Sequence, residues 1–130
     1  MRHLILVLRL IAAAILLQTL WFKFSGASES KYIFTQLHAE PYGRWFAGLS
    51  ELIAGILLLV PATQIIGALM AIGIMLGAIL SHLFVLGIVV QDDGGQLFAL
   101  AVFVLLCAVL IVFLQREKLK TLPLVGKYLR

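Results

Sequence analysis

The stretch Leu97–Leu114, with the sequence LFALAVFVLLCAVLIVFL, contains no charged residue and decides the fold. A helix of about 20 apolar residues is long enough to cross the hydrocarbon core of a bilayer. Three more apolar runs precede it, at residues 4–22, 41–60 and 65–90. The sequence therefore predicts an all-α fold, a single integral membrane four-helix bundle that takes up residues 1–130.

The overall composition agrees with a membrane protein. Of the 130 residues, 63% are hydrophobic and 12% are charged, whereas a soluble domain is nearer half apolar and a quarter charged. This composition leaves little room for a soluble catalytic domain beside the four spans. The single cysteine, Cys107, cannot form an internal disulfide, and we expect it to act as a small buried hydrophobe.

The basic residues gather at the two ends of the chain. The first nine residues hold two of the ten Lys and Arg residues and the tail 115–130 holds five, and the net charge is +4. Nucleic-acid binding would need clustered basic residues with exposed aromatics, so this charge is better explained by membrane topology. The positive-inside rule predicts a multi-pass membrane protein with both termini and the basic tail in the cytoplasm. We expect the membrane to be the plasma (inner) membrane.

The longest polar connection, residues 25–40, also carries a helical pattern. Tyr32, Ile33, Phe34 and Leu37 recur there at helical spacing. We expect a short amphipathic helix in this first outer loop, which either lies in the interface or folds back over the bundle. An ordinary loop is the alternative.

Three ionisable residues, Lys23, Glu51 and His82, lie in or beside the apolar runs. Ionisable groups are costly in lipid, so they usually face a bundle interior and mark a site. At about 1.5 Å of rise per residue, Glu51 lies roughly 15 Å and His82 roughly 12 Å inside the outer ends of their spans. Lys23 ends the first span, with Gln18 below it. These four residues form the predicted ligand-binding site in the outer half, and Arg9 is expected to snorkel to the opposite surface.

Small residues indicate where helices approach closely. Gly48 and Gly55 share a helical face with the glutamate of the second span, and we expect another helix to pack beside it. In the third span, Gly73, Gly77 and Ser81 repeat every four residues. That stripe predicts a second tight helix–helix contact.

The chemistry of this site is left open by the residues alone. Lys23 by itself is more often an interfacial anchor, and Glu51 or His82 can serve a purely structural polar contact. As a pair, Glu51 and His82 could relay a proton, bind a polar headgroup or hydrogen-bond a quinone carbonyl. One Glu and one His make a poor metal site, and haem ligation by a lone histidine is disfavoured. No catalytic residue is assigned.

The chain resembles the DoxX-like (DoxX/DoxD) family of small membrane proteins from about Arg9 to Leu114. The segments that carry the resemblance are Lys23-Phe24-Ser25-Gly26, Glu51-Leu52-Ile53-Ala54-Gly55, Ser81-His82 and Asp93-Gly94-Gly95. Relatives often have proline before the acidic residue that follows the first segment, where this chain has Ser28 before Glu29. The resemblance implies association with membrane redox chemistry, because the family is linked to quinol oxidase, to thiosulfate:quinone oxidoreduction and to oxidative-stress complexes.

Three functions compete at this stage. The first is a quinone-linked accessory protein of membrane redox or oxidative-stress chemistry, with quinone as the ligand. The second is a non-enzymatic assembly or structural subunit, whose partner would be a respiratory or redox complex or a second copy of the chain. The third, a small transporter, fits less well, because alternating access usually needs repeats and broken helices. The lipid bilayer is a partner in every case.

Overall fold

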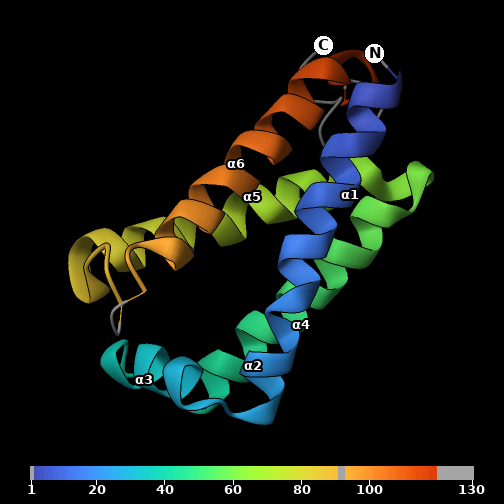
Figure 1. Cartoon of the computed structure of the whole chain (residues 1–130). Helices are drawn as coiled ribbons and strands as arrows, with labels where there is room; N and C mark the ends of the chain where they lie inside the picture. Colours follow the sequence, from blue (N-terminus) through green and yellow to red (C-terminus); the bar gives the residue numbers. More distant parts are fainter. Residues whose placement is uncertain (1, 91–92, 120–130) are drawn as a thin grey trace.

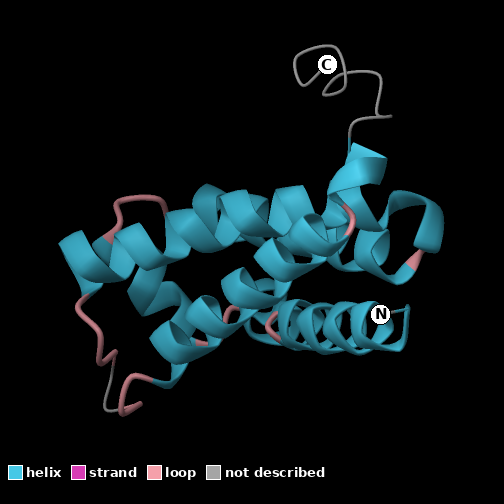
Figure 2. Cartoon of the chain, turned by 90° about the horizontal axis from the view of Figure 1, so that it is seen from above, coloured by secondary structure: helices cyan, strands magenta, loops and turns pink. Residues whose placement is uncertain are grey.

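The computed structural model describes residues 2–90 and 93–119, and all of its regular structure there is helical (Figures 1 and 2). The elements are α1 (Arg2–Gln18), α2 (Leu20–Ser25), α3 (Ser28–Gln36), α4 (Tyr42–Leu59), η1 (Pro61–Thr63), α5 (Gln64–Ser81), η2 (His82–Leu86), α6 (Gln96–Leu114) and α7 (Arg116–Leu119). Four spans are long and apolar enough to cross a membrane. The predicted four-helix membrane bundle is confirmed, and residues 120–130 of the predicted basic tail lie outside the described residues.

Two of the four spans are interrupted helices. Thr19 separates α1 from α2, and its hydroxyl lies 2.8 Å from the carbonyl oxygen of Leu16. Such side-chain-to-backbone bonds commonly bend helices. The third span continues from α5 into the π-helical turn η2 and ends at Leu86, four residues before the end expected from hydropathy. The helix stops there because Gly87 adopts a positive φ of 81°.

The bundle is splayed into two helix pairs. Helix α1 packs against α4, and α5 packs against α6. Figure 1 shows the pairs meeting near the N-terminus of α1 and parting toward the other end of the molecule. The short helix α3 lies across the open end and contacts both α4 and η2. The predicted amphipathic helix therefore exists, and it folds back over the bundle.

The apolar core fills the end where the two pairs meet. Helix α6 contributes one face to this core. The buried residues of that face are Ala101, Val104, Cys107, Ala108 and Ile111. They pack with Ala12, Leu16 and Leu58 of the first pair. Small side chains dominate this core, so the four helix backbones come close together there.

Glycines beside the buried glutamate make the close contact that the sequence predicts. A Cβ added at Gly48 would lie 2.9 Å from the ring of Phe24, and one at Gly55 would lie 2.7 Å from Leu17. Both positions lie on α4 and face the first span. This prediction is confirmed, because only a hydrogen side chain lets α1 and α2 approach α4 this closely.

The glycine stripe of α5 is a different case. A Cβ added at Gly73 or Gly77 would meet nothing within 4 Å, so the predicted tight contact is wrong within this chain. Helix α5 instead packs through another face, whose buried residues include Ala68, Ala71 and Met75. Its close approach to α4 occurs at Gly67, outside the stripe. Of the stripe, Gly73 lies on the open surface of the helix, whereas Gly77 and Ser81 line a cavity.

Arg9 is buried and does not snorkel, which corrects a second expectation. Its Nε donates to the carbonyl of Leu58 at 2.8 Å, and its Nη2 donates to the carbonyl of Leu59 at 2.9 Å. Those carbonyls end α4 and lack partners within the helix. The guanidinium therefore caps the C-terminus of α4, where a positive charge is also favoured by the helix dipole.

We expect Arg9→Met to lower the free energy of unfolding by about 1–2 kcal/mol, because hydrogen bonds within membrane bundles contribute on this scale. The measurement is reversible unfolding in mixed detergent micelles. Arg2→Met, which removes an exposed arginine from the same helix, is the matched control and should change stability little. Equal losses in the two variants would contradict the capping role.

Candidate functional site

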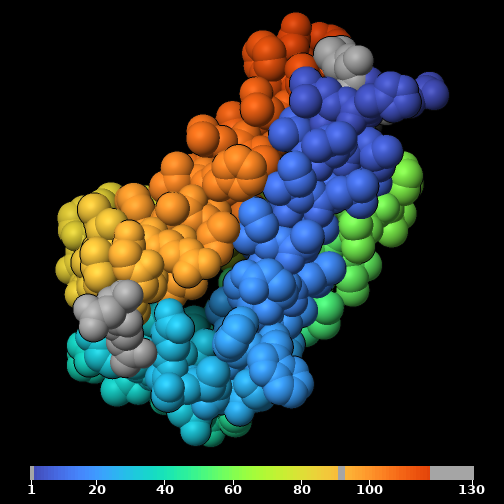
Figure 3. Space-filling model, viewed as in Figure 1, coloured from blue at the N-terminus to red at the C-terminus, as the bar shows by residue number. Residues whose placement is uncertain are grey.

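A cavity of about 540 Å³ lies where the two helix pairs part. This volume is within the usual range of 300–1,000 Å³ for small-molecule sites. All four spans and α3 contribute to its lining, and Figure 3 shows a hollow between orange α6, blue α1–α2 and cyan α3. Gln18, Lys23, Glu51 and His82 all line it. The four residues of the predicted site are thus brought to one cavity.

Glu51 is held on the α4 wall by two partners from the first span. Lys23 Nζ lies 3.1 Å from both carboxylate oxygens, and the hydroxyl of Thr19 lies 2.5 Å from Oε2. Glu51 is 6% exposed, and the Lys23 side chain is 16% exposed. The pair is therefore largely shielded from solvent. Gly48, one turn before Glu51 on α4, leaves room for the end of α2, because an added Cβ would lie 2.9 Å from the Phe24 ring and 3.5 Å from the Cβ of Lys23.

Thr19 is a site residue that the sequence reading missed. Its hydroxyl has one proton and two acceptors within reach, the carbonyl of Leu16 and the carboxylate of Glu51. The sequence did contain an indication of this role, because Thr19 precedes Lys23 by four residues and therefore shares a helical face with it. It was overlooked because threonine is uncharged and common in membrane helices.

Arg44 is the second missed residue, and it fixes Lys23 through the main chain. It is buried, and its Nη1 donates to the backbone carbonyl of Lys23. Its Nε donates to both carboxylate oxygens of Glu40, at 2.9 and 3.0 Å. The i, i+4 spacing of Glu40 and Arg44 was visible in the sequence. The spacing alone does not show that the end of α2 lies against Glu40 and Arg44.

His82 occupies the opposite wall, in the π-helical turn η2. It is 5% exposed, and its ring packs edge-on against Phe98 at a centroid distance of 5.6 Å. Its Nδ1 lies 2.9 Å from the carbonyl oxygen of Gly87. Single π-helical turns of this kind are frequent at functional sites. Within the described residues His82 makes no bond to Glu51, so the two share the cavity from separate walls.

Asp93 organises the loop beside His82. Its carboxylate accepts hydrogen bonds from the backbone N–H groups of Val90, Gly95 and Leu97, at 3.0, 2.8 and 3.1 Å. Burial raises the pKa of the Asp93 carboxyl, but these three backbone hydrogen bonds favour the charged form, and the pKa lies below its ordinary value. Asp93 therefore acts as an anionic cap for the start of α6.

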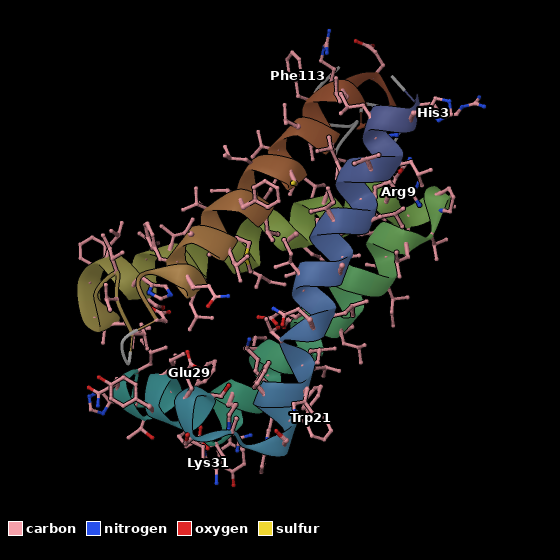
Figure 4. The ribbon with its side chains drawn as sticks, in the orientation of Figure 1. His3, Arg9, Trp21, Glu29, Lys31 and Phe113 are labelled. Atoms are coloured by element: carbon pink, nitrogen blue, oxygen red, sulfur yellow. The ribbon has the colours of Figure 1, made fainter. Side chains whose placement is uncertain are left out.

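Helix α3 closes the open end of the cavity. Its residues Glu29, Ser30, Ile33 and Phe34 belong to the lining. Figure 4 shows Glu29 on the side of α3 that faces the other helices and Lys31 on the opposite side. The cavity thus has an apolar lining with a few polar groups at fixed places, which is the usual character of a small-molecule site.

Across residues 2–90 and 93–119, no three His, Cys, Asp or Glu side chains come together as a ligand set. Glu51 is engaged by Lys23, and Asp93 is engaged by backbone N–H groups.

The DoxX family model matches residues 4–86 of the chain. The chain belongs to the DoxX family. The matched part of this DoxX protein runs from α1 to η2 and carries Gln18, Lys23, Glu51 and His82. Helix α6, which completes the cavity, lies beyond the match. No curated protein and no solved structure matches the chain.

Proposed function

We propose that this DoxX protein is a quinone-linked accessory component of membrane redox or oxidative-stress chemistry, and that its cavity binds the quinone head. One observation carries the proposal. A cavity of suitable volume within apolar spans presents Lys23 on one wall and His82 on the other. A quinone has the matching character, with an aromatic ring between two oxygens and an apolar tail.

Lys23 is the group best suited to bind a ligand oxygen. An ammonium group has three N–H donors, and the contact with Glu51 does not use all of them. Glu51 holds the ammonium in place and neutralises its charge. The tail of the ligand would leave through the gap between the helix pairs, where the surrounding lipid is apolar.

The proposed orientation places both termini in the cytoplasm and the cavity in the outer half of the plasma (inner) membrane. Support comes from the positive-inside rule. The N-terminus of α1 and the C-terminal end of α6 lie at the same end of the bundle, away from α3 (Figure 1). Ligand would therefore reach the cavity from the side of the membrane that faces away from the cytoplasm.

Titration of the purified protein with menaquinone and ubiquinone analogues tests the proposal. We expect binding that Glu51→Gln weakens about tenfold, or roughly 1.4 kcal/mol, because a neutral amide no longer fixes the Lys23 ammonium. Glu117→Gln, in α7 at the other end of the bundle, is the matched control. Absence of binding, or equal affinity in Glu51→Gln and the wild type, would remove this function.

A non-enzymatic assembly subunit is the second candidate, and the open surface of α5 at Gly73 favours it. Gly73 leaves room for a partner helix to approach the α5 backbone closely. A pull-down in mild detergent should then recover a stoichiometric partner that Gly73→Leu releases. Recovery of the isolated chain alone would count against this candidate.

A further inference from the structure

We infer that the cavity selects the reduced, hydroxyl-bearing form of its ligand, a hydroquinone, and that Nε2 of His82 accepts the hydrogen bond from that hydroxyl. The inference rests on the proposed function, since it assumes that a quinone-type head occupies the cavity. It is carried by the hydrogen bonds of His82 and by the distribution of donors and acceptors on the two walls.

The tautomer of His82 follows from its partner. Nδ1 lies 2.9 Å from the carbonyl oxygen of Gly87. A carbonyl oxygen only accepts hydrogen bonds, so Nδ1 must carry the proton. In a neutral imidazole with its proton on Nδ1, the other nitrogen, Nε2, presents a lone pair and acts as an acceptor.

The backbone around Gly87 keeps that carbonyl in place. The N–H of Gly87 donates to the carbonyl of His82 at 2.7 Å, which closes the turn. Gly87 has φ 81° and ψ 167°, a conformation that is essentially restricted to glycine. The ring of His82 is held from another side by Phe98. The orientation of the imidazole is therefore set by the fold before any ligand binds.

Nε2 has no partner among the described residues, and His82 lines the cavity. The carboxylate of Asp93, in the loop after η2, offers no donor, because it already accepts three backbone N–H bonds. A ligand that satisfies Nε2 must therefore bring its own proton. The hydroxyl of a hydroquinone does so, whereas the carbonyl of a quinone would place one lone pair against another.

The opposite wall has the complementary character. The carboxylate of Glu51 already accepts hydrogen bonds from Thr19 and Lys23, and Lys23 has further N–H groups to donate. The wall that holds Lys23 thus offers hydrogen-bond donors, and the wall that holds His82 offers a hydrogen-bond acceptor. A hydroquinone can meet both, because each of its oxygens can donate one bond and accept another.

The test compares one menaquinone analogue in its naphthoquinone and naphthohydroquinone forms, with binding measured without oxygen. We expect the wild type to bind the hydroquinone about ten times more tightly. His82→Asn keeps an N–H donor toward Gly87 and lacks the Nε2 acceptor, so the ratio of the two affinities should fall to about one. His38→Asn is the matched control, because His38 is exposed and its positive φ of 58° suits asparagine.

The dimethyl ether of the same hydroquinone tests the inference on the unaltered protein. It has no proton to donate, and we expect it to bind at least tenfold more weakly than the hydroquinone. Equal binding of the ether and the hydroquinone, or tighter binding of the quinone, would overturn the selectivity and leave the proposed function standing. If none of the three compounds binds, the proposed function itself fails.

Discussion

Lys23→Met is expected to lower the free energy of unfolding by about 3 kcal/mol, the loss typical when one partner is removed from a buried ion pair. The substitution preserves most of the side-chain volume and leaves the carboxylate of Glu51 without its counter-charge. Thr19 remains as a hydrogen-bond donor but carries no charge. Reversible unfolding in mixed detergent micelles gives the measurement.

The double variant Lys23→Met/Glu51→Met separates the charge from the packing. It removes both members of the pair, so most of the lost stability should return, because no unpaired charge remains. Lys31→Met on α3, at a lysine that faces away from the cavity (Figure 4), controls for the loss of a cation. A double variant no more stable than Lys23→Met would show that the ion pair is not what holds α2 against α4.

Gly67→Ala is expected to destabilise the bundle by about 3 kcal/mol, at the upper end of the usual cost of overpacking. An added Cβ would lie 2.7 Å from the backbone nitrogen of Leu58 and 2.9 Å from the carbonyl carbon of Leu57. Main-chain atoms cannot rotate aside as a side chain can. The whole of α5 must therefore move away from α4. Because this contact lies at the C-terminal end of α4, the cap that Arg9 provides there is disturbed as well.

Gly73→Ala lies on the same helix and provides the matched control. Its Cβ would meet nothing within 4 Å, and alanine is favoured over glycine in a helix by up to about 1 kcal/mol. We expect stability to rise slightly or stay unchanged. The two substitutions are chemically identical and differ only in surroundings, so equal unfolding free energies would contradict the packing of α5 against α4.

The four spans could be predicted because the length and hydropathy of an apolar segment are read directly from the sequence. Depth could be predicted as well, because the rise per residue of a helix is nearly constant. It placed Gln18, Lys23, Glu51 and His82 in the same half of the bundle, and all four line one cavity. Their role as a ligand site stays a prediction.

Helix rotation could not be predicted in the same way. A helix that is apolar all round has no polar face to show which side meets a neighbour. The glycine spacing of α5 was therefore assigned to a contact that occurs instead at Gly67. For the same reason Arg9 was assigned to the surface, although the end of α4 lies beside it. The partners of Glu51 and His82 likewise depend on packing between helices far apart in sequence.

The splayed arrangement makes the molecule asymmetric across the bilayer. The cavity is lined by the second half of the first span, the start of α4, the end of the third span and the start of α6, whereas the other end is filled by the core. In the proposed orientation, such a cavity would communicate with the lipids of a single leaflet. A lipid-soluble molecule in the opposite leaflet would first have to flip its polar head across the bilayer. The protein would therefore sense the composition of one leaflet, and its occupancy would report a local pool of ligand rather than the total in the membrane.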